Sequence, residues 1–354
     1  MADQQVQSNS NFNLGEIFGM PFSEVLELIK NIKSHIRRIE IPKKDGSKRR
    51  ITAPDEKLKF LQRRLYYYVF KQYKPTDYAH GFIARRNIKS NASPHVGATV
   101  LGKIDIKSFF DTISADHLKN CLFGNRGLCR RCKYHERMLD GKCHPSLYAN
   151  KKKKYEFGCE EMKAVFIPTY CERRGYQPLI KTMIELCTLD GFTAQGFPTS
   201  PVLANIVMRG VDLRLAAFCK EHGIVYTRYA DDLAFSSSTL TRDQLKALVL
   251  PKARRLLWAF QFRVNNKKIS FVTRARRMRL CGVVINQKLS PTRQLVNTLR
   301  GQIHRATVMQ PGQTTKKDIR HLKGITSFVM SIDRPKGEKY MNKLREFEKS
   351  RVAI

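Results

Sequence analysis

The sequence predicts an α+β fold of two or three domains, and three observations support this prediction. Segments with helical apolar spacing alternate with short strand-like runs bounded by turn residues. The chain has 354 residues, of which 42% are hydrophobic, enough to bury a sizeable core. The stretch VYTRYADDLAFSSS, from Val225 to Ser238, has the pattern of a β-hairpin with two adjacent aspartates at its turn.

The first 71 residues predict a polar leader, a helix, a strand pair and a second helix. Residues 22–32 have apolar side chains at helical spacing, after starting signals at Pro21 and Ser23. Residues 37–54 predict two short strands joined by the turn at 44–47. The second helix, residues 56–71, carries an apolar stripe that we expect in the core, formed by Leu58, Leu61, Leu65 and Tyr68.

The middle of the chain predicts a buried strand, a long helix and the hairpin. The strand begins near residue 99 and ends at Asp105, just before two aromatic residues. Residues 115–192 are rich in Cys and Lys and show no simple period. Residues 200–223 predict a helix that stops at Gly223, and the hairpin follows directly.

The charge of the chain indicates a polyanionic partner. The sequence contains 66 Lys and Arg against 30 Asp and Glu, a formal charge of +36. From residue 244 to 317 there is no acidic residue, whereas 17 positions are Lys or Arg. A uniformly basic surface gains free energy by releasing counterions from phosphates, so we expect this part to face nucleic acid.

The sequence indicates where in the cell the protein acts and whether it contacts a membrane. No run of about 18 apolar residues and no signal peptide is found, so we expect a cytoplasmic protein with no membrane partner. Nine cysteines without an export signal favour reduced thiols over a disulfide framework.

Three carboxylates form the candidate catalytic site. Asp105 ends one strand, and Asp231 and Asp232 lie at the hairpin turn. If these side chains meet at one sheet edge they repel each other, and a divalent cation that prefers oxygen ligands, Mg²⁺ first, removes that repulsion. Two such ions about 4 Å apart would stabilise phosphoryl transfer. The alternative is a solvated Asp-Asp turn pair.

A second motif, AQGFPTSPVLAN, follows the Cys-rich part. Gln195 and Gly196 precede a helix start, where glycine permits close backbone approach and the first N–H groups are unpaired. The order is therefore Asp-x-x-x-Phe-Phe, then Gln-Gly-x-x-x-Ser-Pro, then Tyr-Ala-Asp-Asp, which predicts a catalytic strand, a substrate platform and a catalytic hairpin.

This order closely resembles that of reverse transcriptases, over roughly Ile41 to Asn286. The resemblance implies a right-hand polymerase with fingers, a palm of antiparallel sheet and helices, and a basic helical thumb. We expect a leader and helix in 1–40, fingers and palm in 41–259 with the Cys-rich insert at about 115–192, and the end of the palm and the thumb in 260–354. It also implies that Asp105, Asp231 and Asp232, with the backbone carbonyl of Ile106, hold two Mg²⁺ ions.

The same resemblance implies five nucleotide-binding residues. Lys43 and Arg50 match fingers residues that contact the triphosphate, and Gln195 matches a position that contacts the incoming nucleotide. Phe110 matches the aromatic residue that excludes a ribose 2′-hydroxyl by its bulk. Lys268, or its neighbour Lys267, corresponds to the lysine near the pyrophosphate.

The segment Asn91-Ala92-x-x-His95 resembles a signature of bacterial retron reverse transcriptases, in which it lies near the RNA. That branch implies a structured non-coding RNA as template and primer, 2′-hydroxyl priming, a branched RNA–DNA product, and antiphage defence with a separate effector protein. Where retron enzymes typically carry Val-Thr-Gly, this chain has Leu280-Cys281-Gly282. Other bacterial defence or group II intron-like reverse transcriptases, and a non-catalytic RNA-binding protein, therefore remain alternatives.

The Cys-rich insert is a candidate structural zinc site. Cys129-x-x-Cys132 with Cys143 downstream has the spacing of part of such a site, and the alternative is a set of reduced surface thiols. The candidates for a fourth ligand are Cys121, His144, Cys159 and Cys171.

Overall fold

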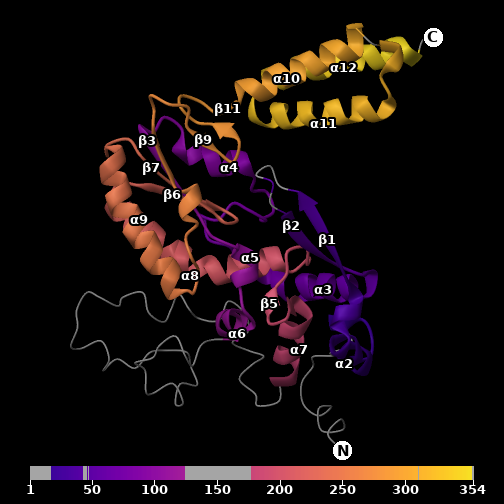
Figure 1. Ribbon diagram of the computed structural model, residues 1–354, viewed down its shortest axis with the longest axis vertical. Coiled ribbons are helices and arrows are strands. Elements are labelled where there is room, and N and C mark those ends of the chain that lie inside the picture. Colours follow the sequence, from indigo (N-terminus) through magenta and orange to yellow (C-terminus); the bar gives the residue numbers. More distant parts are fainter. Residues whose placement is uncertain (1–16, 43–45, 47, 124–176, 310, 353–354) are drawn as a thin grey trace, which may run out of the picture. The chain divides into compact units, whose positions relative to one another are not determined.

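A computed structural model describes residues 17–42, 46, 48–123, 177–309 and 311–352. The chain divides into two compact units, each built from three separate segments. The first comprises Met1–Asp77, Ile106–Leu215 and Arg255–Val264, and the second comprises Tyr78–Asp105, Ala216–Arg254 and Asn265–Ile354. Helices and antiparallel strands occur in both, which confirms the predicted α+β class (Figure 1). The boundaries of fingers, palm and thumb stay a prediction.

The first unit is mainly helical. It contains α2 (Phe22–Lys30), η1 (Ile32–His35), β1 (Ile36–Pro42), β2 (Lys48–Pro54), α3 (Glu56–Tyr68), η2 (Phe70–Gln72), α5 (Phe109–Thr112), α6 (Ala115–Phe123), α7 (Gln177–Cys187), β4 (Thr188–Leu189) and β5 (Phe192–Thr193). It also holds most of α8 (Ser200–Glu221) and the end of α9 (Arg242–Ala259). Strands β1 and β2 pair antiparallel from Ile36↔Pro54 to Pro42↔Lys48, as predicted.

Helix α3 confirms most of the predicted apolar stripe and corrects one member. The Asp55 side chain accepts a hydrogen bond from the Leu58 N–H and so caps the helix. Leu58, Leu61 and Leu65 are fully buried, whereas Tyr68 is 43% exposed. The inclusion of Tyr68 was wrong because the buried row continues four residues after Leu65, at Val69.

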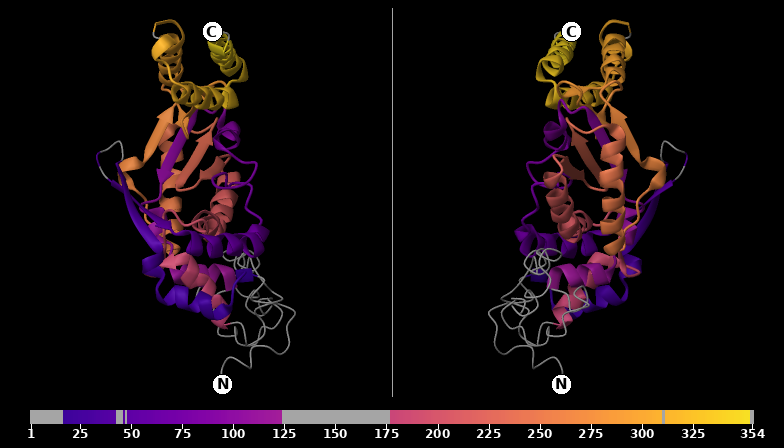
Figure 2. Two further views of the ribbon diagram at one scale, coloured as in Figure 1. Left: turned by 90° about the vertical axis from the view of Figure 1, so that its right-hand side faces the viewer. Right: turned by 90° about the vertical axis from the view of Figure 1, so that its left-hand side faces the viewer.

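The second unit is built around an antiparallel sheet of strand order β6-β7-β3-β8 (Figures 1 and 2). Its elements are α4 (Ile88–Ala92), η3 (Ser93–His95), β3 (Val100–Asp105), β6 (Val225–Tyr229), β7 (Asp232–Ser237), η6 (Asn266–Lys268), β8 (Ser270–Thr273), β9 (Arg279–Leu280), β10 (Val283–Val284), β11 (Ser290–Pro291), α10 (Arg293–His304), η7 (Arg305–Met309), η8 (Pro311–Gln313), α11 (Lys316–Ile332) and α12 (Arg334–Val352). Strands β9, β10 and β11 form a second small sheet.

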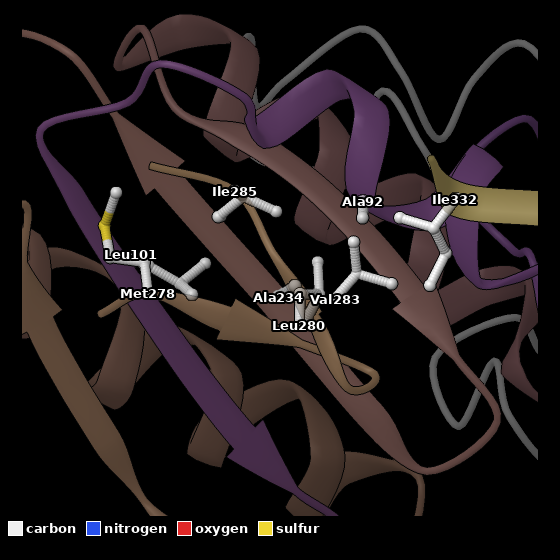
Figure 3. Packing of buried hydrophobic residues seen from close by; sticks show 8 residues of the cluster. All are labelled: Ala92, Leu101, Ala234, Met278, Leu280, Val283, Ile285 and Ile332. Atoms are coloured by element: carbon white, nitrogen blue, oxygen red, sulfur yellow. The ribbon is translucent and has the colours of Figure 1, made fainter. Parts of the chain in front are cut away.

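One apolar cluster attaches the small sheet to the large one. Leu101 and Ala234 project from β3 and β7, and they pack with residues of α4, of the β9–β10 region and of α11 (Figure 3). The other members are Ala92, Met278, Leu280, Val283, Ile285 and Ile332. Burial of this cluster holds β3 and β7, the strands that carry Asp105 and Asp232, against α4 and the small sheet.

The three C-terminal helices pack on a core of their own. Leu299 and Ile303 of α10 meet Leu322 and Val329 of α11 and Leu344 of α12. Thr315 and Asp318 form a capping box at the start of α11. Among the described residues, no helix combines the length and the apolar character that crossing a lipid bilayer requires.

Candidate active site

The hairpin of β6 and β7 turns as the sequence predicted. Tyr229 and Asp232 are its last paired residues, so Ala230 and Asp231 form a two-residue turn. Ala230 has φ of 56°, the left-handed conformation that a tight hairpin turn requires. This geometry places Asp231 at the tip and Asp232 at the start of β7.

Strand β3 brings Asp105 to the same place. Asp105 and Asp232 are opposite one another in the antiparallel register of β3 and β7. Opposite residues of an antiparallel pair project from the same face of a sheet. The structure therefore gathers the three predicted carboxylates at one sheet end, although Asp105 lies far from the others in sequence.

The electrostatics show that these groups interact. Burial raises the pKa of Asp232 to about 6, and the negative charges of Asp231 and Asp105 add to this rise. Lys268 and Lys103 oppose it. Ionising the whole group is therefore unfavourable unless positive charge lies near it.

Lys268 brings positive charge to this group of carboxylates. Its Nζ lies 2.8 Å from Oδ1 of Asp105, and the Asn265 side-chain amide donates to Oδ2 at 2.9 Å. The hydrogen bond to Asp105 raises the pKa of Lys268. Of the two lysines that the sequence left open, the structure thus brings Lys268 to the carboxylates.

The donor set fits a hard divalent cation. Within the described ranges, no three Asp, Glu, His or Cys side chains already converge on a common point for a metal. The Asp105 carboxylate instead contacts the ammonium group of Lys268, which supplies positive charge beside the three carboxylates. Mg²⁺ binds oxygen ligands, and its positive charge would offset the repulsion between the carboxylates.

The platform motif is connected to the β1–β2 hairpin within the first unit. Thr52, two residues after Arg50 on β2, donates its N–H to the Gln195 carbonyl at 2.7 Å. Gly196 has φ of 120°, and a Cβ there would lie 2.4 Å from the Thr52 carbonyl oxygen. Only glycine permits this approach. Arg50 is exposed and lies 3.7 Å from Glu40, and Lys43 lies outside the described residues.

Comparison with known proteins decides the family. The sequence profile described as "Reverse transcriptase (RNA-dependent DNA polymerase)" matches residues 41–285. The chain belongs to the reverse transcriptase family. The predicted family is therefore confirmed, and members of this family use divalent metal ions.

The curated relatives of this reverse transcriptase include retron enzymes. It is 31% identical to the "Retron Mx162 reverse transcriptase" of Myxococcus xanthus, over 88% of this chain and 61% of that protein. It is 27% identical to the "Retron Ec86 reverse transcriptase" of Escherichia coli, over 92% of this chain and 86% of that one. The chain spans about three fifths of the length of the Myxococcus relatives.

Solved structures add only a distant likeness. The apo telomerase of Candida tropicalis is 11% identical and has a TM-score of 0.45, with 94% of this chain and 63% of that chain covered. A likeness at this level carries no further weight for the reverse transcriptase.

The two aromatic residues of the reverse transcriptase after β3 occupy different environments. Phe109 is buried and its ring packs 5.6 Å from that of Phe262. Phe110 is half-buried, and its carbonyl accepts a hydrogen bond from the Thr193 hydroxyl at 2.7 Å. The accessible ring is that of Phe110, the residue predicted to exclude ribonucleotides. Ile106 is buried and bridges to Val264, and its role as a metal ligand stays a prediction.

The two residues predicted to contact RNA are buried inside the protein. Asn91 and His95 have no solvent exposure. The Asn91 amide donates to Sγ of Cys281 at 3.5 Å, and both ring nitrogens of His95 have hydroxyl partners. No polar atom of either side chain reaches the surface in this structure, and contact of these two residues with RNA stays a prediction.

Asn265 and Arg228 contribute to the candidate site, although the sequence alone did not indicate either of them. Asn265 holds Asp105 through both its side chain and its backbone N–H. Arg228 is fully buried and donates to the Ala230 carbonyl at 2.9 Å, at the hairpin turn. A charged residue within an apolar strand was the available signal for Arg228, whereas nothing distinguished Asn265 from its neighbour.

Of the candidate zinc ligands, the structure describes Cys121. Cys129, Cys132 and Cys143 lie outside the described residues, as do His144, Cys159 and Cys171. Cys121 belongs to α6 and is a free thiol whose pKa burial raises to about 12.

Proposed function

We propose that this protein is an RNA-directed DNA polymerase that joins deoxynucleoside triphosphates to a primer hydroxyl under the direction of an RNA template. The observation that carries the proposal is the pairing of Asp105 with Asp232 beside the Asp231 turn, within a segment that matches the reverse transcriptase family. A solvated turn pair does not explain a third carboxylate brought from another strand.

Asp105, Asp231 and Asp232 would hold two Mg²⁺ ions, which when bound activate the attacking hydroxyl and neutralise the leaving pyrophosphate. The protein's own part is positioning. Lys268 now holds Asp105, and a cation there would release its ammonium group for the pyrophosphate. Arg50 and Lys43 would contact the triphosphate, Gln195 the nucleotide, and Phe110 would exclude the 2′-hydroxyl. Ile106 would add a backbone carbonyl to the metal site.

The substrate we propose is a structured non-coding RNA that serves as both template and primer, as in retrons. Support comes from the retron names of the relatives and from the Asn-Ala-x-x-His segment. Priming from a 2′-hydroxyl, a branched RNA–DNA product, a role in antiphage defence and a separate effector protein belong to the same proposal. The protein would act in the cytoplasm.

A second candidate keeps the enzyme and changes the RNA. Leu280-Cys281-Gly282 departs from the retron pattern and favours another bacterial defence or group II intron-like reverse transcriptase. Sequencing the nucleic acid that copurifies with the protein, before and after RNase, separates the two. For the insert we propose a structural zinc ion, which elemental analysis of the purified protein tests.

The polymerase proposal is tested by Asp232→Asn and Asp231→Asn. Each variant should lower the rate of deoxynucleotide incorporation by about a thousandfold or more, because a metal ligand is lost, while RNA binding changes little. Asp243→Asn, an exposed residue of α9, is the matched control and should behave as wild type. Undiminished incorporation by either active-site variant would refute the site.

A further inference from the structure

The segment from Asn91 to His95 has three side chains inside the protein and two outside. Asn91, Ala92 and His95 are buried, whereas Ser93 and Pro94 are exposed. A surface that reads RNA would need the opposite arrangement. The three buried side chains must therefore serve contacts within the fold.

The contacts of His95 form a directed chain of hydrogen bonds. The Thr227 hydroxyl donates to the Asn91 carbonyl at 3.4 Å, so its oxygen is left to accept from Nε2 of His95, 2.8 Å away. Nδ1 then accepts from the Ser236 hydroxyl at 2.7 Å. The imidazole must be neutral for this, and burial lowers the pKa of His95 to about 3.

The two hydroxyl partners belong to the two strands of the carboxylate hairpin. Thr227 lies four residues before Asp231 on β6, and Ser236 lies four residues after Asp232 on β7. Thr227 is opposite Ala234, and Asp232, Ala234 and Ser236 alternate along β7. All of them therefore project from the face that carries Asp232.

Helix α4, which directly precedes η3 and His95, connects the hairpin to the rest of the unit. Ala92 and Ala234 belong to the same apolar cluster (Figure 3), and the Asn91 amide reaches Cys281 between β9 and β10. On the face that carries Asp232, α4 and η3 together thus contact both hairpin strands and the adjoining small sheet.

We propose that His95 is a positioning residue for catalysis: by bridging Thr227 and Ser236 it fixes the hairpin that places Asp231 and Asp232 opposite Asp105. This inference rests on the proposed polymerase function. It assigns the Asn-Ala-x-x-His segment to the geometry of the metal-binding carboxylates and not to recognition of RNA.

Three substitutions remove the bridge in different ways. His95→Leu removes both hydrogen bonds, Ser236→Ala removes one, and Thr227→Val removes the other with little change of shape. Incorporation on a generic RNA template with a DNA primer is measured as kcat, KM and the Mg²⁺ concentration at half-maximal rate. The assay temperature is well below the melting temperature of each variant. The kcat is calculated per active enzyme molecule.

We expect His95→Leu to lower kcat by about ten- to a hundredfold, because small displacements of catalytic groups are costly. Its half-saturating Mg²⁺ concentration should rise at least about threefold, since the carboxylates no longer meet in one geometry. Ser236→Ala and Thr227→Val should shift both quantities in the same direction by less. His95→Gln, which can still donate and accept, should recover part of the loss.

Ser93→Ala, an exposed change in the same segment, is the matched control and should leave the Mg²⁺ dependence as in wild type. The proposal is overturned if the bridge variants keep the wild-type kcat and Mg²⁺ dependence, whether they lose RNA affinity or only thermal stability. Should His95→Leu fail to fold, the two hydroxyl variants decide the question. Absence of any incorporation by the wild type would instead refute the polymerase proposal.

Discussion

At the scale of single residues, the site is a problem of like charges held together. Asp232 retains exposed surface, yet burial and two neighbouring carboxylates raise its pKa to about 6. Lys268 relieves part of this repulsion at Asp105. The arrangement is poised to accept a cation, because every interaction among the carboxylates improves when positive charge is added.

The raised pKa of Asp232 predicts a pH-dependent stability in the absence of metal. The folded state keeps the proton up to about pH 6 and the unfolded chain releases it near the ordinary value of 3.8, so stability falls as pH rises between these values. Asp232→Asn does not ionise and should lack this fall. Urea unfolding with chelator present from pH 4 to 7.5 measures the difference.

Adding Mg²⁺ at pH 7.5 should then stabilise the wild type more than Asp232→Asn, since only the wild type offers the full set of ligands. The control is Asp243→Asn, which should follow the wild type throughout. Identical pH profiles for the wild type and Asp232→Asn would contradict the electrostatic description.

Phe110 makes a second prediction at the residue scale. Its ring is half-buried beside the core residue Phe109, so it can be shortened with less damage to packing. Phe110→Val should raise the efficiency of ribonucleotide incorporation relative to deoxynucleotide by about tenfold or more, because the steric block is removed. The ratio of kcat/KM for the paired triphosphates measures it, and an unchanged ratio would count against the role.

At the scale of elements, close backbone contacts join motifs that are distant in sequence. The platform before α8 adjoins β2 through the bond from Thr52 to Gln195, and Gly196 permits this contact. The turn between β6 and β7 is held by the buried Arg228. The contact between Thr52 and Gln195 joins main-chain atoms far apart in sequence, so local sequence patterns do not reveal it, whereas Arg228 and Ala230 are two residues apart.

A pair of glycines predicts opposite effects of the same substitution. Gly196→Ala should lower the free energy of unfolding by about 1–3 kcal/mol, because of the Thr52 carbonyl and the positive φ. It should also raise the KM for nucleotides through displacement of Gln195. Gly301→Ala within α10 meets no atom within 4 Å and should raise the free energy by about 0.5–1 kcal/mol. Urea unfolding of both variants is the measurement, and a stabilised Gly196→Ala would contradict the contact.

At the scale of the whole molecule, a formal charge of +36 implies strong dependence of RNA affinity on salt. The C-terminal helices pack through leucine and isoleucine, which leaves cations such as Arg300 and Lys317 exposed. Arg300→Gln with Lys317→Gln should weaken binding alike for unrelated RNAs and should reduce the log–log salt slope by about one for each lost phosphate contact.

The matched control for this charge prediction is Lys30→Gln with Lys220→Gln, two exposed cations outside the C-terminal helices. It should leave the slope nearly unchanged. Equal losses in the two double variants would show that RNA affinity depends on the total charge and not on the cations of the C-terminal helices.

The limits of sequence reasoning are visible in particular residues. The hairpin at 225–238, the pairing of β1 with β2 and the buried leucines of α3 were predictable, because turn residues and apolar periods are local signals. Tyr68 was misplaced because the apolar row passes to Val69. Asn265 was missed because its neighbour along the chain, Asn266, has the same side chain, and only the register beside β3 distinguishes them.

What the sequence determined by itself is chemistry: carboxylates, cations and an order of motifs typical of a reverse transcriptase, since side-chain identity and spacing are written in the chain. Only the tertiary structure decided which residues meet and which side chains are buried. Asp105 meets Asp232 across two strands, Lys268 and not Lys267 reaches Asp105, and Asn91 and His95 turn inward. Such outcomes depend on long-range register and burial, which residues acquire only from partners far away along the chain.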